Sequence, residues 1–126
     1  MTEESADLTR PVIGAALTVL NTLRPGLDAG FYTRALVIEL RRQGIHCGQD
    51  REYEVFYDGE VIGAITPGLV VEDLLIVEVR VVPDFDDSQI AQMQGILNIA
   101  GIPTGLLLNF KYPKLGIKRV SRALNF

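Results

Sequence analysis

Apolar residues recur at helical spacing in the first third of the chain and predict two helices there. Between residues 9 and 23 they return every three or four positions, with Thr9 as the expected N-cap. A second helix is predicted from Phe31 to Gln43, where Gly44 ends it. Residues 1–8 are polar and acidic, and they predict a flexible tail in front of a domain that covers residues 9–126.

The middle of the chain alternates between apolar and polar positions, as half-buried strands do. Four strands are expected, in two hairpins that turn at Asp58-Gly59 and at Glu72-Asp73: 51–57, 61–65, 69–71 and 74–82. If the second turn has two residues, Gly68 faces Val77 and lies beside Glu78.

The last third predicts one more helix and two more strands. The helix begins after a cap at Asp86, Asp87 or Ser88 and ends near Ala100, where Gly101 is a stop signal. Strands are expected at 104–110 and, along an edge, at 116–120. The order of elements predicts a single α/β domain with a mixed sheet, flanked by helices, and one long crossover between strands 74–82 and 104–110.

The strand 74–82 is apolar except for Glu78 and Arg80, which share one face because side chains alternate along a strand. A strand that is apolar on both faces is expected to be buried on both. Buried charges need a partner or a chemical role. The pair therefore predicts either a residual metal or phosphate site or, as we favour, an ion pair.

Composition excludes several classes of protein. One cysteine, Cys47, excludes an internal disulfide, and the neighbouring His46 is interpreted as a loop residue rather than a metal ligand. The polar start is no signal peptide, and no apolar run reaches the roughly 18 residues that span a bilayer. We therefore expect a cytoplasmic protein without membrane contact.

Net charge is −4, so the chain as a whole does not have the basic field of a nucleic-acid-binding protein. Basic residues do gather near the C-terminus, where they form either a nucleic-acid patch or a solvated edge strand protected by its charges: Lys111, Lys114, Lys118, Arg119 and Arg122.

Several strings, taken in order, resemble the bacterial GxxExxY proteins, a branch of the PD-(D/E)XK nuclease superfamily. They are IGAALTVLNTLRPGL, YDGEVIG, LVVEDLLIVEV, GLLLNF and PKLGIKRV. The resemblance covers about residues 11–120 and implies a three-layer α/β restriction-endonuclease-like fold. In active members it implies an Asp and a Glu that bind Mg²⁺, a Lys that orients water, and a helical Glu that assists.

On that pattern this chain carries a degenerate site. The helical Glu falls on Ala29, the metal-binding Asp on Gly68, and the Lys on Arg80. The Glu survives as Glu78. A Gln of the third helix survives as Gln92, although the Tyr that follows it four residues later in the family is Ile96, and Tyr32 also survives. Asp28 is the best substitute for a missing carboxylate, but at the start of a helix one position rotates a side chain by about 100°.

These departures favour a protein that has lost catalysis and needs no cofactor. The leading expectation is that the protein binds further copies of itself and so forms a symmetric homo-oligomer or a shell-like structure. The apolar segments expected to supply it are Ala64–Leu69, Leu106–Phe110 and Phe126. The alternatives are a nucleic-acid-binding pseudonuclease and a weak Mg²⁺-dependent nuclease that uses Glu78, Asp28 and Arg80.

Overall fold

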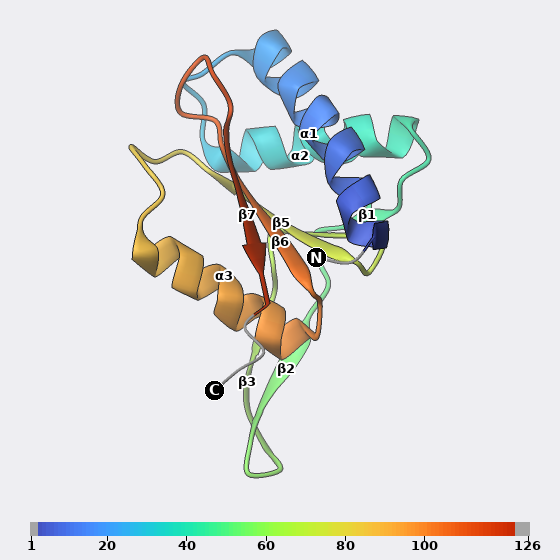
Figure 1. Ribbon diagram of the computed structural model, residues 1–126, viewed down its shortest axis with the longest axis vertical. Helices are drawn as coiled ribbons and strands as arrows, with labels where there is room; N and C mark the ends of the chain where they lie inside the picture. Colours follow the sequence, from blue (N-terminus) through green and yellow to red (C-terminus); the bar gives the residue numbers. More distant parts are fainter. Residues whose placement is uncertain (1–2, 123–126) are drawn as a thin grey trace.

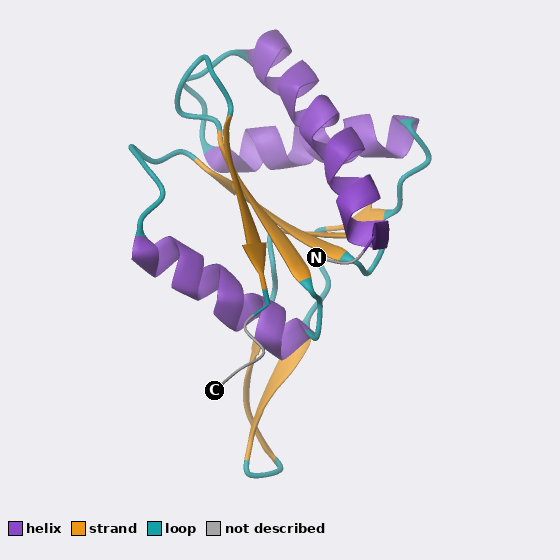
Figure 2. Ribbon diagram, in the orientation of Figure 1, coloured by secondary structure: helices purple, strands orange, loops and turns teal. Residues whose placement is uncertain are grey.

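The computed structural model describes residues 3–122, and side chains from residue 7 onward. It has three layers (Figures 1 and 2), with a central sheet between two helices on one face and a third helix on the other. The helices are α1 (Glu3–Leu23), α2 (Ala29–Arg42) and α3 (Asp87–Ala100). The sheet has the order β1-β4-β5-β6-β7: Cys47–Gly48, Leu69–Val71, Leu75–Arg80, Thr104–Asn109 and Gly116–Ser121.

The sheet is mixed, as predicted, and its one parallel pair is the crossover pair β5 and β6. Two apolar clusters fill its two faces. Leu75, Val77 and Val79 of β5 pack with α1 and α2, whereas Ile76 packs with Met93 and Leu97 of α3. This strict alternation puts the even-numbered residues of β5, including Glu78 and Arg80, on the α3 face.

The predicted start of the first helix is wrong. The helix α1 begins at Glu3, within the predicted tail, and not after a cap at Thr9. Thr9 is buried inside the helix, and Leu8 packs against the cluster of α1 and α2. Pro11 lies inside this helix, where it lacks the amide that would bond to the carbonyl of Asp7 and where its ring crowds that carbonyl. Apolar contact in the turn before Pro11 compensates for that loss.

Two strands, β2 (Tyr53–Tyr57) and β3 (Glu60–Ile65), form a separate hairpin that projects from the body beyond the end of the sheet (Figure 1). The predicted turn is confirmed: Asp58 and Gly59 both have positive φ, as a two-residue hairpin turn requires. We call residues 52–65 the arm. Its base contacts the body through Tyr53, which packs against the α3-side cluster.

The exposed apolar residues coincide with the predicted ones only in part. Leu106–Phe110 is buried throughout, because β6 is an inner strand covered on both faces. Within Ala64–Leu69, Ala64 is exposed and Ile65 half-buried, whereas Leu69 is buried. Phe126 lies outside the described residues. The arm also exposes large apolar side chains, namely Phe56, Tyr57, Val61 and Ile62. No helix within residues 3–122 is long and apolar enough to cross a bilayer.

Candidate functional site

The hairpin of β4 and β5 brings Gly68 opposite Glu78. Leu69 pairs with Val77 and Val71 with Leu75, which is one residue off the predicted register. Glu72 and Asp73 both have positive φ, and the amide of Leu74 donates to the carbonyl of Val71 at 3.0 Å. Leu74 is therefore the extra residue, and continuing the register puts Gly68 across from Glu78 itself rather than across from Val77.

Both carboxylate oxygens of Glu78 are engaged. Its Oε1 accepts a hydrogen bond from Nη1 of Arg80 at 2.9 Å, and its Oε2 accepts one from the backbone amide of Gly68. Glu78 is only 8% exposed, so this carboxylate is buried with two donors on it. The predicted ion pair between Glu78 and Arg80 is confirmed.

Arg80 extends the pair toward α3. Its Nη2 donates to Oε1 of Gln92 at 3.2 Å, and its side chain is 24% exposed. The structure thus brings together four of the sequence-predicted site residues, which are Gly68, Glu78, Arg80 and Gln92. They form a chain of contacts from the β4 backbone to the surface of α3.

Asn109 is a buried polar residue that the sequence reasoning missed. It pairs with Arg80 across the β5–β6 ladder. Its side chain both donates a hydrogen bond to the backbone of Val82 and accepts one from it. Its Nδ2 donates to the Val82 carbonyl at 2.8 Å, and its Oδ1 accepts from the Val82 amide at 3.2 Å. The side chain therefore continues the ladder beyond the ends of the two strands. The sequence did contain a signal for this role, because Asn109 is a single polar residue at the end of an apolar strand.

The positions at the start of α2 belong to the other face of the sheet. Ala29 packs against the cluster of α1 and α2, and Asp28 is the N-cap residue of α2 without a side-chain capping bond. Tyr32 has a structural role. Its hydroxyl donates to the Arg24 carbonyl at 2.7 Å and accepts from the Leu27 amide at 3.1 Å, which closes the loop between α1 and α2.

The residues present do not fit the divalent cation that the nuclease fold implies. Residues 3–122 contain no group of three His, Cys, Asp or Glu side chains placed to hold a metal ion. Position 68 has no side chain, and a Cβ built there would lie 3.0 Å from Oε2 of Glu78. The guanidinium of Arg80 already holds the other oxygen. The geometry offers instead a carboxylate, that of Glu78, whose negative charge is balanced by Arg80.

The C-terminal basic residues do not share one face. Lys118 lies opposite Leu107, on the α3 side of the sheet, whereas Arg119 lies opposite Leu106, on the side of α1 and α2. Lys111 lies in the loop before β7 and Arg122 follows the strand, at its other end. At about 3.4 Å per residue, the strand separates these two ends by roughly 20 Å. The five side chains line an edge rather than form a compact patch.

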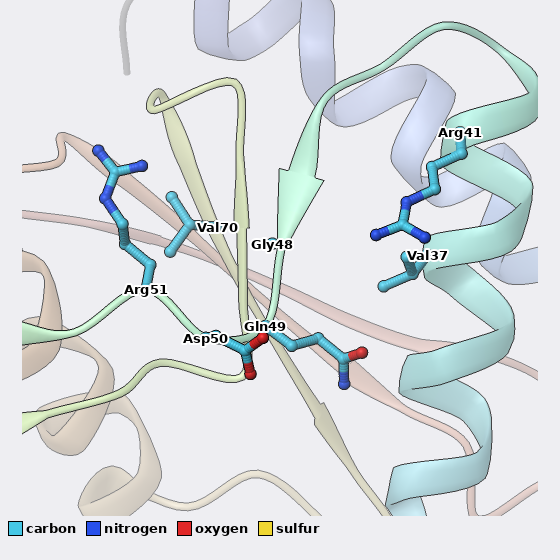
Figure 3. Close-up of a pocket in the computed structure, with 7 residues that line it drawn as sticks. All are labelled: Val37, Arg41, Gly48, Gln49, Asp50, Arg51 and Val70. Carbon is cyan, nitrogen blue, oxygen red and sulfur yellow. The ribbon is translucent and has the colours of Figure 1, made fainter.

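A pocket of about 340 Å³ lies at the opposite edge of the sheet, between α2 and β1 (Figure 3). The side chains of Arg41 and Gln49 extend into it, and Arg51 at its rim is paired with Asp73 at 2.8 Å. The neighbouring Cys47 is half-buried, and burial raises the pKa of its thiol. The pocket is not lined by any residue of the Glu78 chain of contacts.

Comparisons with known proteins agree with this architecture. A family model described as PD-(D/E)XK nuclease superfamily matches residues 6–120. The fold is also similar to the crystal structure of SSO0001, with a TM-score of 0.57 and 14% identity over 75% of this chain. The chain spans half the length of that protein. No curated protein matches the sequence. The predicted restriction-endonuclease-like fold is thereby confirmed.

Proposed function

The chain belongs to the PD-(D/E)XK nuclease superfamily, and on that premise we propose that it is a catalytically inactive member that acts through protein–protein contacts. Its partner is a further copy of itself, in a closed homo-oligomer or a shell. In this proposal the family fold is a scaffold, and the residues at the family's metal-site positions stabilise that fold.

The observation that carries the loss of catalysis is the closed arrangement of Glu78. Metal-assisted hydrolysis needs an ion held by several carboxylates, to activate water and to offset phosphate charge. Here Glu78, the one buried carboxylate among residues 7–122, is paired with Arg80 and accepts a hydrogen bond from the Gly68 amide. A planar guanidinium with a fixed fork also differs from the compact ammonium of a water-positioning lysine.

Self-assembly is supported by the arm. An isolated two-stranded hairpin is at best marginally stable in water. This one projects from the body with its largest apolar side chains exposed, as Phe56 and Val61 illustrate at 58% and 53%. Exposed apolar groups that gather on one element are typical of an interaction surface. Homo-oligomers usually close by point symmetry.

We expect no cleavage when the protein is incubated with single- and double-stranded DNA and RNA in the presence of Mg²⁺ or Mn²⁺. Gel analysis of the products is the measurement, and the Glu78→Ala variant is the control for a contaminating nuclease. Cleavage that is present in the natural protein and lost in Glu78→Ala would contradict the proposed loss of catalysis and support the weak nuclease instead.

We expect sedimentation at micromolar protein concentration to give a mass that is a multiple of the 13.9 kDa chain. The exposed apolar side chains of the arm gain stability when another surface buries them, and a second copy of the chain can supply that surface. Analytical ultracentrifugation gives the mass, and electron microscopy of the same sample gives the shape. One species at the monomer mass would refute self-assembly, whatever the result of the cleavage assay.

A further inference from the structure

The charged residues of the arm are all acidic. Residues 52–65 contain four carboxylates and no Lys or Arg: Glu52, Glu54, Asp58 and Glu60. Phe56 pairs with Val61 across the two strands, and Glu54 lies two residues before Phe56 on the same face. This face of the arm therefore presents an apolar pair beside a negative charge.

The outer edge of β7 has the complementary character. No acidic residue occurs from Phe110 to the C-terminus, whereas the strand and the residue after it carry Lys118, Arg119 and Arg122. Ile117 is exposed and shares a face with Arg119. Since β7 pairs only with β6 in the described sheet, its outer backbone groups are free to accept another strand.

Among the side chains of residues 7–122, no carboxylate of the arm and no cation of the β7 edge forms an ion pair. The ion pairs among the described residues are Arg42–Glu39, Arg51–Asp73 and Arg80–Glu78. The arm also points away from the body, so its tip does not fold back on its own β7 (Figure 1). One molecule thus displays two surfaces of opposite charge.

We infer that the arm of one copy docks on the β7 edge of a second copy. This inference rests on the proposed self-assembly and identifies its contact. Glu54 and Glu60 meet Arg119 and Lys118, and the apolar side chains of the arm cover Ile117. A strand of the arm can add to the free edge of β7, which is a recurring mode of recognition between chains.

The contact is heterologous, because the arm and the edge are different surfaces of the same chain. Repeating such a contact gives a ring if the rotation closes and a filament if it does not. Nucleic acid fits the edge less well, since its cations point to both faces of the sheet and the chain carries a net charge of −4.

Charge reversal on either surface is expected to dissociate the assembly. The arm variant is Glu54→Lys with Glu60→Lys, and the edge variant is Lys118→Glu with Arg119→Glu. Each puts like charges across the contact, so sedimentation should shift from the assembled mass to the 13.9 kDa monomer. The matched control, Arg10→Glu with Arg41→Glu, reverses two exposed charges on helices and should stay assembled.

Mixing the variants makes the test specific. At the contact positions the edge variant has an acidic arm and an acidic edge, whereas the arm variant has a basic arm and a basic edge. In an equimolar mixture every contact between unlike variants joins opposite charges, so the mixture should regain an assembled mass in which the two variants alternate. A single chain with all four substitutions restores opposite charges at every contact and should regain the assembled mass. Unchanged thermal unfolding of each isolated variant, relative to the dissociated natural chain, shows that the fold is intact.

The outcomes separate this inference from the proposal on which it rests. If the natural protein is assembled and both reversed variants remain assembled, the contact lies elsewhere and the inference fails while self-assembly stands. If the edge variant loses salt-dependent binding to DNA or RNA but keeps its assembled mass, the edge serves nucleic acid and the inference fails. A monomeric natural protein overturns both.

Discussion

Replacing Glu78 by Ala lowers the free energy of unfolding by about 3 kcal/mol, because it leaves the guanidinium of Arg80 without its anion in a largely apolar strand. The expected loss is at the lower end for a buried pair, since Arg80 is 24% exposed and keeps its bond to Gln92. The amide of Gly68 also loses its acceptor. Urea unfolding at one fixed protein concentration is the measurement, because the proposed assembly would make stability depend on concentration.

The double variant Glu78→Ala with Arg80→Met is the decisive comparison. It removes both charges and keeps an apolar chain of similar length, so it should recover about 1–2 kcal/mol of the loss. Asp7→Ala, which removes an exposed carboxylate from α1, should change stability by no more than about 0.5 kcal/mol. Equal stability of the single and double variants would show that solvent and Gln92 satisfy Arg80 without Glu78.

Replacing Phe110 by Ala is expected to destabilise the fold by about 3–5 kcal/mol. Phe110 is fully buried at the end of β6, and its ring stacks on Tyr32 of α2 with the centroids 4.7 Å apart. Truncation therefore opens a cavity between the sheet and α2 and removes an aromatic contact as well. Thermal and urea unfolding of the variant measure the effect.

Two milder variants show how that loss is divided. Phe110→Leu keeps most of the apolar volume and should lose less than half as much as Phe110→Ala. Tyr32→Phe keeps the ring stack but removes the hydroxyl bonds to Arg24 and Leu27, at about 1–2 kcal/mol. Faster hydrogen exchange in residues 24–28 of Tyr32→Phe would locate its effect in the loop. An Ala variant as stable as the Leu variant would refute the cavity argument.

Periodicity and turn chemistry were enough to predict most of the fold. The turn at Asp58-Gly59 and the stop at Gly101 are local signals that the structure confirms. Of the three predicted caps for α3, Asp86, Asp87 and Ser88, the structure selects Asp86. The start of α1 was wrong because the contact that holds it, Leu8 on the core, is tertiary. The strand β1 was missed because two residues carry no pattern. It is fixed by contacts between residues 26 positions apart: the Glu72 amide donates to the His46 carbonyl, and the His46 amide donates to the side-chain Oε1 of Glu72.

The part of the site that depends on the alternation of side chains along a strand was predictable from the sequence. Because Glu78 and Arg80 are two residues apart on a strand, the sequence placed them on one face, and their pairing followed from the free energy of burial. The exact partner of Gly68 depended on one extra residue, Leu74, which no turn rule required. Asn109 escaped notice because its role depends on where two strands diverge. The projection of the arm likewise depends on which strands join the sheet.

The bond between the Gly68 amide and Glu78 has a consequence for single substitutions. One substitution does not give this arrangement a two-carboxylate centre. Gly68→Asp alone would set its Cβ against Oε2 of Glu78 while Arg80 still held the other oxygen. Arg80→Lys alone would give up the bond to Gln92 and gain no second ligand. Each of these single substitutions therefore loses stabilising contacts of the buried pair without completing a two-carboxylate centre.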